Sequence, residues 1–297
     1  MTSIDSEVRE KELLRKISRR KFLGMVAAGA SAAVAADAFL IEPNRPKVVR
    51  REIALRRWPQ RMGGFTVALL SDFHYDPYFS VHPLRAAIGI VNGLHPDLIV
   101  LTGDFASVPL IGGNHRAGAR HVEPCARLLA QMRAPYGLCA VMGNHDVDTD
   151  PSRVTAALRE NGIRVLRNQS VPVEKDGSRF WLAGIDDLLG KTADLSATLH
   201  GIPSDEATIL LAHEPDYADV VAAHPVDLQL SGHSHGGQVR IPLVPPLYLP
   251  ALGRKYIWGQ YQIRELTLYT NPGLGTIAIP VRLNCAPEIT LLTLRRA

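Results

Sequence analysis

The sequence predicts a layered α/β domain with a mixed sheet, and three observations carry this prediction. The 297 residues are 46% hydrophobic and 21% charged, which is ordinary for a globular protein and sufficient for one large domain. Short apolar runs bounded by turn residues alternate with segments of helical periodicity over most of the chain. From residue 238 onward, strand-like segments follow one another directly. This order of elements is typical of a layered α/β fold.

The expected elements follow from the local apolar patterns. Strands are predicted at residues 48–55, 65–70, 97–102, 137–142, 180–185, 208–212, 228–230, 238–241, 260–263, 267–269 and 288–294. Helices are predicted at residues 84–94, 122–132, 152–161 and 217–223. The third helix is expected to end at Gly162, a usual stop signal.

The first 41 residues have the pattern of an export signal. Ser18-Arg19-Arg20-Lys21-Phe22-Leu23 precedes a stretch rich in Ala and Gly, and it resembles the S-R-R-x-F-L motif of the twin-arginine pathway. The alternative is a transmembrane anchor, because residues 22–41 are long enough to cross a bilayer. Two small-x-small sites, at 33–35 and 36–38, leave cleavage open. We expect residues 1–41 to form a signal or membrane tether and residues 42–47 a linker.

The charge distribution argues against a nucleic-acid partner. Residues 1–21 hold seven Lys or Arg and four Asp or Glu, so most of the formal net charge of +4 lies in the signal segment. A domain that binds nucleic acid should carry a basic patch in its folded part. No nucleic-acid partner is therefore expected.

The three cysteines do not form a zinc motif. Cys125, Cys139 and Cys285 include no C-x-x-C pair, which argues against a zinc site built from thiolates. We expect buried free thiols, with a single disulfide as the alternative.

Polar clusters follow several of the short apolar strands. They are Asp72-Phe73-His74, Gly103-Asp104, Gly143-Asn144-His145-Asp146, His213 and Gly232-His233-Ser234-His235. Ligand sites in open α/β sheets lie beyond the carboxyl ends of the strands, so we expect these clusters to converge. Their oxygen and imidazole donors suit Mn, Fe, Zn or Co, and they are numerous enough for two ions that share a carboxylate. Two such ions form the clamp used to hydrolyse phosphate esters.

The ordered set D-x-H, G-D, G-N-H-D, H and G-H-x-H resembles the signature of the calcineurin-like metallophosphoesterase superfamily, from residue 65 to about residue 240. The resemblance implies a four-layer α/β/β/α sandwich with mixed sheets, a di-metal site at the carboxyl rim of the strands, and a catalytic domain at residues 48–297. It implies that Asp72, His74, Asp104 and His235 hold one divalent ion. It implies that Asp104, Asn144, His213 and His233 hold the other. Mn is the expected metal, with Fe, Zn or Co as alternatives.

The same resemblance implies the reaction. A hydroxide that bridges the two ions would attack phosphorus in line. His145 would protonate the leaving oxygen or stabilise the transition state. Asp146 is expected to support this site by orienting His145.

Two departures exclude subgroups of the superfamily. Ser107 stands where purple acid phosphatases place a metal-binding Tyr, and residues 103–107 lack the G-D-x-x-D-R-G element of Ser/Thr protein phosphatases. Four elements resemble a subgroup of twin-arginine-exported bacterial phosphoesterases: the run 232–238 that ends in Gly236-Gly237-Gln238, the apolar Pro-rich loop after it, and residues 256–259 and 271–289. That subgroup also contains UDP-2,3-diacylglucosamine pyrophosphatases of lipid A biosynthesis.

The subgroup implies a phosphodiesterase or pyrophosphatase that acts on a lipid-linked substrate. The apolar loop Ile241–Leu252 either packs over the sheet edge or contacts acyl chains or a membrane. We expect export to the periplasm by the twin-arginine translocase, with association with a membrane surface. The resemblance implies that the lipid A step is cytoplasmic, which is at odds with an export signal. Either the substrate is a different lipid-linked phosphodiester outside the cytoplasm, or the signal holds the enzyme at a membrane. The alternatives are an exported nucleotidase or nuclease and a non-catalytic metal-bound envelope protein. A Gly-rich loop at residues 112–118 is expected to cover the site.

Overall fold

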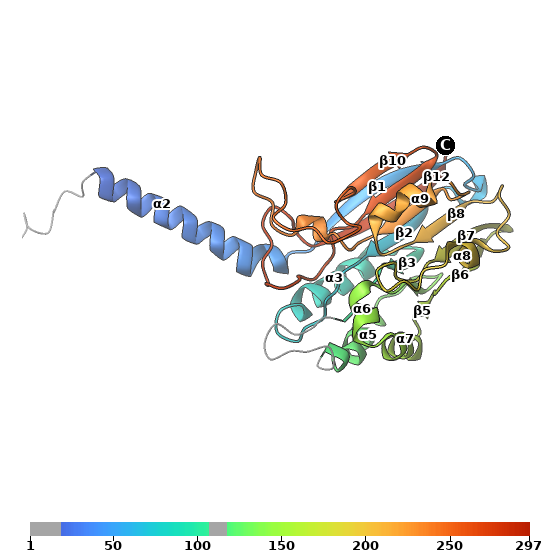
Figure 1. The fold of residues 1–297 in the computed structure, drawn as a ribbon, viewed down its shortest axis with the longest axis horizontal. Helices are drawn as coiled ribbons and strands as arrows, with labels where there is room; N and C mark the ends of the chain where they lie inside the picture. Colours follow the sequence, from blue (N-terminus) through green and yellow to red (C-terminus); the bar gives the residue numbers. More distant parts are fainter. Residues whose placement is uncertain (1–18, 107–117) are drawn as a thin grey trace, which may run out of the picture.

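The computed structural model describes residues 19–106 and 118–297. The basic segment that opens the predicted signal and nearly all of the predicted covering loop at 112–118 lie outside the described residues. Two six-stranded mixed sheets form the centre of the domain (Figure 1). The predicted mixture of parallel and antiparallel strands is therefore confirmed, with the strands divided between two sheets.

The first sheet has the strand order β1-β12-β2-β3-β4-β5. Its strands are β1 (Lys47–Leu55), β12 (Glu288–Arg296), β2 (Phe65–Leu70), β3 (Leu98–Leu101), β4 (Leu138–Ala140) and β5 (Arg164–Val165). β2 to β5 are parallel. β12 runs antiparallel to β2 and parallel to β1, with Lys47 opposite Glu288 and Leu55 opposite Arg296. The last strand of the chain therefore lies between the first two.

The second sheet has the strand order β10-β11-β9-β8-β7-β6. Its strands are β10 (Gly259–Ile263), β11 (Leu266–Thr270), β9 (Leu228–Ser231), β8 (Thr208–Leu211), β7 (Ser178–Gly184) and β6 (Gln169–Lys175). The four central strands are parallel, and the two edge strands are antiparallel to their neighbours. The polar clusters therefore lie at the carboxyl ends of parallel strands in both sheets.

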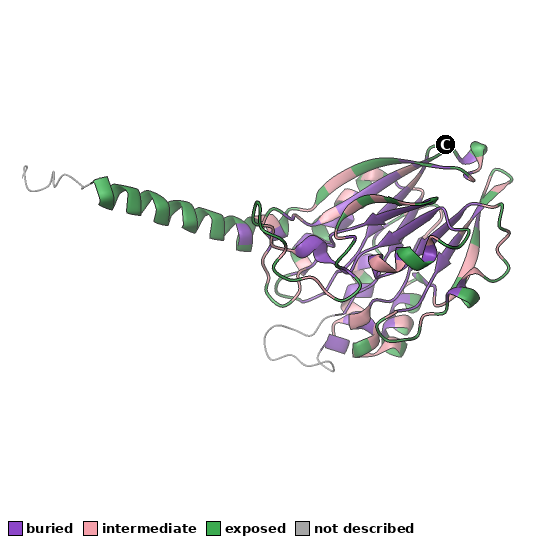
Figure 2. Cartoon of the chain, turned by 45° about the horizontal axis from the view of Figure 1, so that its top comes forward, coloured by how far each residue is buried: buried purple, intermediate pink, exposed green. Residues whose placement is uncertain are grey.

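Helices cover the outer face of each sheet and give four layers. α3 (Val81–Leu94), α5 (Val122–Leu129) and α7 (Pro151–Glu160) pack on the first sheet, and the short α8 (Leu195–Leu199) and α9 (Ala218–Val221) pack on the second. Between the sheets lies a third apolar core, in which the Phe180 ring is 4.8 Å from Trp58 and 5.4 Å from Phe65. The buried strands are visible in Figure 2. The predicted α/β/β/α sandwich is confirmed.

The chain departs from the predicted elements in several places. Three short elements, α6 (Asn144–Thr149), β5 and α8, were not predicted, and two larger departures concern residues 238–241 and β6. Residues 238–241 were expected as a strand, but they form only an isolated bridge between Val239 and Leu283, because Gln238 has a φ of 53° that breaks the extended backbone. The edge strand β6 was not expected; its partner β7 follows across Asp176-Gly177, a turn in which both residues have positive φ. Asp-Gly between two strands is a strong hairpin signal, so the sequence contained this information.

The N-terminal helix projects away from the domain (Figure 1). α2 (Arg19–Ala36) is exposed along its length and continues through a π-helical turn (Asp37–Ile41) and a 3₁₀ turn (Glu42–Asn44). The segment 19–44 is long and apolar enough to cross a membrane, and a signal sequence would have the same properties. The Glu42 carboxylate accepts hydrogen bonds from Asn284 N and Cys285 N, so the expected linker is held against the domain.

The three cysteines are buried and free, as expected. Burial raises the pKa of the Cys139 thiol to about 11 and that of Cys125 further still. Both thiols therefore stay protonated and act as small apolar side chains.

Candidate metal centre

The structure brings the predicted site residues together at the carboxyl ends of strands from both sheets. Asp72 and His74 follow β2, Asp104 follows β3, Asn144 and His145 open α6 (Asn144–Thr149) after β4, His213 follows β8, and His233 and His235 follow β9. All of them except Asn144 and His145 are buried. Residues that lie up to 163 positions apart in the sequence therefore share one centre.

The backbone at this centre is strained. Five of the donor residues have φ between 39° and 68°, a region that side chains other than Gly rarely adopt: Asp72, His74, Asp104, His233 and His235. Such outliers cost of order 1–3 kcal/mol each and concentrate at functional sites. Each one turns the chain sharply at a strand end and aims the side chain across the rim.

One group of donor atoms comes from Asp72, His74 and His235. The Nε2 atoms of His74 and His235 lie 2.9 Å apart, and Asp72 Oδ1 lies 3.4 Å from His235 Nε2. The backbone N–H of His233 donates to both carboxylate oxygens of Asp72, which fixes its orientation. Three ligand atoms of different residues therefore converge on one point.

A second group comes from Asp104, His213 and His233. Asp104 Oδ2 lies 3.2 Å from His213 Nε2 and 3.4 Å from His74 Nε2, so this carboxylate stands between the two groups. His213 Nδ1 lies 2.6 Å from the carbonyl of Thr102, and His233 Nε2 lies 2.7 Å from the carbonyl of Ala251. A ring N–H that donates to a carbonyl leaves the other nitrogen with a lone pair, which is the usual arrangement of a metal-ligating histidine. On this basis we assign His213 Nε2 and His233 Nδ1 as the nitrogens that face the centre; His213 Nε2 would give up its proton when a cation binds.

Asn144 and His145 complete the centre from the start of α6. The Asn144 Oδ1 atom is buried and has no hydrogen-bond partner. An unpaired buried oxygen is costly unless a ligand satisfies it. The His145 ring lies 4.9 Å from the His74 ring, edge to face, and its backbone N–H donates to Asp104 Oδ1.

Asp146 has a different place from the one expected. Its carboxylate accepts hydrogen bonds from the backbone N–H groups of Asp104, Phe105, Ala106 and Gly143, at 2.8–3.0 Å. It therefore ties the loop after β3 to the loop after β4 instead of orienting the His145 ring. This contact holds Asp104 and Asn144 at a fixed separation.

Burial keeps three of the histidines neutral. It lowers the pKa of His74 to about 3 and that of His233 to about 4, and it lowers the pKa of His235 well below the ordinary value. At neutral pH these imidazoles carry lone pairs that point into the centre. Neutral imidazole is the form that binds metal ions.

The two carboxylates respond differently to the same buried environment. Burial raises the pKa of Asp72 to about 6. Burial also opposes ionisation of Asp104, but the neighbouring His213 and His145 hold the pKa of Asp104 well below its usual range. Asp104 in turn raises the pKa of His213 against the effect of burial. Asp104 is therefore the permanent negative charge between the two groups.

The donor set fits divalent cations. Carboxylate oxygens, an amide oxygen without a partner and several neutral imidazoles are packed at 2.9–3.4 Å, distances at which lone pairs face one another. A cation in each of the two groups would neutralise Asp72 and Asp104 and satisfy Asn144 Oδ1. The arrangement suits two ions with Asp104 between them.

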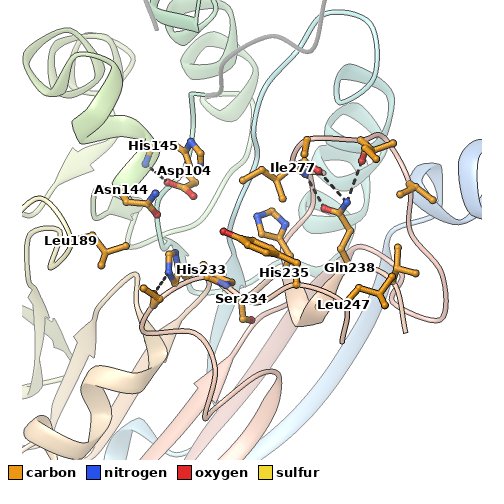
Figure 3. A pocket seen from close by; sticks show the side chains of 18 residues that line it. Asp104, Asn144, His145, Leu189, His233, Ser234, His235, Gln238, Leu247 and Ile277 are labelled. Carbon is orange, nitrogen blue, oxygen red and sulfur yellow. Dashed lines mark hydrogen bonds between the residues drawn. The ribbon is translucent and has the colours of Figure 1, made fainter. Parts of the chain in front are cut away.

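A cavity of about 570 Å³ opens over this centre (Figure 3). Its floor is polar and contains Asp104, Asn144, His145, His233 and His235. Its walls are apolar: Leu247 and Tyr248 come from the loop at 241–252, and Ile277, Ile279 and Val281 come from the segment before β12. A substrate that reaches the centre therefore lies against apolar surface.

The Gly236-Gly237-Gln238 motif builds both walls. The Gln238 carboxamide accepts from Ile277 N and donates to the carbonyls of Ile277 and Ile279, as Figure 3 shows. Gly237 has a φ of 79°, and a Cβ there would lie 2.6 Å from Cβ of Pro246 in the opposite wall. The motif therefore fixes the shape of the cavity directly behind His235.

Comparison with known proteins decides the family. The model of the family described as calcineurin-like phosphoesterase matches residues 65–237, more than half of the chain. The chain belongs to the calcineurin-like phosphoesterase family. It is a metal-dependent phosphoester hydrolase, and the matched range ends with the Gly232–Gly237 run that carries His233 and His235.

Similar calcineurin-like proteins occur in bacteria and animals. The metallophosphoesterase YkuE of Bacillus subtilis is 37% identical over 291 residues, 95% of this chain and 99% of its own. The phosphodiesterase YaeI of Escherichia coli is 32% identical over 283 residues, 94% of this chain and 99% of its own. A transmembrane protein with a metallophosphoesterase domain from Danio rerio is 33% identical over 266 residues, 85% of this chain and 58% of its own.

Several features of this calcineurin-like site were not foreseen from the sequence. The carbonyls of Thr102 and Ala251 set the histidine tautomers, and Gln238 shapes the cavity. Every residue has a backbone carbonyl, so the sequence cannot show that those of Thr102 and Ala251 bind the histidine rings. Gln238 was noted as part of a motif, but the segment it binds lies about 40 residues further along the chain.

Proposed function

We propose that the chain is a di-metal phosphodiesterase or pyrophosphatase that hydrolyses a lipid-linked phosphoester, such as UDP-2,3-diacylglucosamine or a related envelope lipid. The observation that carries the proposal is the cavity, whose floor is the donor cluster and whose walls are apolar. Ligand pockets that bury acyl chains are lined in this way, with a few polar groups where the chemistry occurs. The similarity to a protein named as a phosphodiesterase supports the reaction class.

The site residues divide between two ions in this proposal. Asp72, His74, Asp104 and His235 hold one, and Asp104, Asn144, His213 and His233 hold the other, with Mn as the first candidate and Fe, Zn or Co as alternatives. When bound, the ions supply positive charge to the phosphoryl oxygens and acidify a water. The chain contributes the fixed Asp104 carboxylate, which sets the separation of the two positions.

His145 is the proposed proton donor. Its ring lines the cavity beside His74 and is only partly buried, so a leaving oxygen can reach it. General acid catalysis of this kind contributes typically 10²–10⁴-fold. Asp146 acts as a positioning residue, because its hydrogen bonds hold the backbone on which Asp104 and His145 stand.

The proposed location is the outer face of a membrane, reached by the twin-arginine translocase. Arg19 and Arg20 open α2, which is long and apolar enough to cross a bilayer. The similarity to a protein named as transmembrane supports a tether. In a Gram-negative envelope this places the domain in the periplasm, so the substrate would be an envelope lipid outside the cytoplasm.

The proposal is tested on the full-length protein purified in detergent. Metal content is measured first, and hydrolysis is then compared for bis-p-nitrophenyl phosphate, UDP-2,3-diacylglucosamine, phospholipids and nucleotides with added Mn. We expect Mn-dependent cleavage of the soluble diester and of at least one lipid-linked substrate. If phosphate is released from nucleotides alone, the protein is a nucleotidase and the proposed lipid substrate is wrong. If metal is bound but no substrate is hydrolysed, the protein is a metal-bound binding protein.

A further inference from the structure

Exposed apolar side chains lie both at the cavity and at the base of α2. Leu247, Tyr248 and Ile279 line the cavity over the centre, whereas Leu40 and Tyr78 line a separate hollow. We call Leu40, Tyr78, Leu243, Leu247, Tyr248 and Ile279 the apolar rim; each is at least half exposed, and Leu243 is fully exposed. They come from the base of α2, the loop after β2, the loop at 241–252 and the segment before β12. Large apolar patches on a soluble surface usually mark an interaction site.

The loop at 241–252 and the segment between β11 and β12, which carry four residues of the rim, lie on the side of the domain from which α2 departs (Figure 1). The connection is fixed, because Arg282 N donates to the carbonyl of Ala38 and the Glu42 carboxylate binds the backbone at 284 and 285. Arg282 and residues 284 and 285 come just after Ile279 and Val281 in the sequence, and those two side chains line the cavity. A membrane crossed by α2 is therefore held at the level of the rim.

The residues behind the rim suit a lipid interface. The Arg240 guanidinium stacks on the Trp258 ring at 3.7 Å, and the Trp258 side chain is partly exposed. Both line a groove at the base of α2 in which Arg45, Lys47 and Arg51 stand beside three acidic residues, Asp37, Glu42 and Glu288. Aromatic rings and cations of this kind gather at the level of lipid headgroups.

We propose that the apolar rim inserts into the surface of the membrane that α2 crosses, so that the cavity opens within the lipid headgroup layer. The occupant is a lipid surface and not a second protein, because α2 brings the bilayer itself to the rim. Insertion removes the exposed Leu, Ile and Tyr side chains from water, which the hydrophobic effect favours. A lipid then enters the cavity from the membrane plane, with its phosphoester toward Asp104 and its chains along Leu247 and Ile279.

This inference rests on the proposed membrane tether, and its test uses no turnover. Full-length Leu243→Cys is labelled with an environment-sensitive fluorophore; the three native cysteines are buried and do not compete. The matched control is Asp205→Cys, an exposed residue in the turn before β8, at the opposite end of that strand from His213. Both proteins are reconstituted into vesicles of phosphatidylethanolamine and phosphatidylglycerol that contain a doxyl-labelled lipid.

We expect the label at 243 to emit at shorter wavelength and to be quenched several-fold more than the label at 205. A Leu243→Cys protein that floats with the vesicles but shows the same emission and quenching as the control would overturn the docking. Failure to float would overturn the tether as well as the docking. If the label at 243 is quenched as expected but the separate hydrolysis assays of the wild type show no cleavage, only the proposed function is contradicted, so the two failures are distinguishable.

Discussion

At the scale of single residues, Asp104 is the side chain that connects the two groups of donor atoms. Its Oδ2 atom faces both His74 and His213, and its Oδ1 atom accepts the backbone N–H of His145. No other carboxylate described in the cluster reaches both donor groups. Asp104 therefore couples the two metal positions to the proposed proton donor.

Replacing Asp104 by Ala should abolish both metal binding and activity. We expect activity on bis-p-nitrophenyl phosphate to fall by at least about a thousandfold, because charge stabilisation of the phosphoryl group is lost. Metal content, measured by inductively coupled plasma mass spectrometry, should fall in parallel. Wild-type activity in this variant would contradict the assigned di-metal centre.

Replacing His145 by Gln should separate chemistry from metal binding. The side chain is in none of the hydrogen bonds that hold Asp72, His213 or His233, so metal content and thermal stability should stay as in the wild type. kcat should fall by about 10²–10⁴-fold. A loss of metal as large as in Asp104→Ala would show that His145 is a ligand.

Most donor residues could be predicted from the sequence because each follows a short apolar strand. The strand pattern fixes which end of the sheet they occupy, and the residue types fix the chemistry. The role of Asp146 could not be predicted, because three of its four partners are backbone groups about 40 residues earlier. Its position next to His145 favoured the wrong contact.

At the scale of elements, the Gly236-Gly237-Gln238 turn replaces the strand that the apolar pattern of residues 238–241 predicts. Positive φ at Gly236, Gly237 and Gln238 sends the chain into the loop at 241–252 instead of along the sheet. Apolar periodicity alone cannot report this, because the residues of 239–244 face a cavity wall and solvent rather than a sheet. The missed strand β6 has the opposite cause: its outward residues are polar, and only the Asp176-Gly177 turn signals it.

Substitution of Gly237 by Ala should lower the free energy of unfolding by more than the strain of a positive φ alone. Gly237 and Gly201 have φ of 79° and 77°, but an added Cβ meets Pro246 at 2.6 Å in the first case and nothing within 4 Å in the second. We expect Gly201→Ala to lower the free energy of unfolding by about 1–2 kcal/mol and Gly237→Ala by roughly 1–3 kcal/mol more. Equal losses in urea denaturation would show that Pro246 simply moves aside.

The junction of α2 with the domain predicts that the helix is retained. The first small-x-small site lies inside the continuous helix α2, and in the second Ala38 is buried with its carbonyl bonded to Arg282 N. Neither site is extended and free for a peptidase. Intact mass of protein extracted from membranes should include residues 1–41, and a mature N-terminus at Ala36 or Phe39 would contradict a tether.

At the scale of the whole molecule, the metal centre joins the two sheets. Donors from β2, β3 and β4 lie in the first sheet, and donors from β8 and β9 lie in the second. The order of elements predicted a layered α/β fold, but not where one sheet ends and the next begins. That boundary falls between β5 and β6, a short strand and an unexpected one.

Removal of metal should therefore destabilise the domain as a unit. A ligand present at about 100 times its dissociation constant stabilises a fold by about 2.7 kcal/mol, which corresponds to roughly 5–10 °C in Tm for a domain of this size. We expect EDTA to lower Tm by this amount and Mn to restore it. The Asp104→Ala variant is the control, because its Tm should respond to neither; a wild-type Tm that EDTA leaves unchanged would mean that the sheets hold together without the ions.

The pairing of β1 with β12 has a consequence for biosynthesis. β1 is synthesised soon after α2, but its neighbour β12 follows only after all the strands of the second sheet. Until β12 has been made, β1 has no neighbour and the edge of β2 stays open. The first sheet therefore cannot close strand by strand as the chain emerges, and it is completed only after the strands of the second sheet have been made.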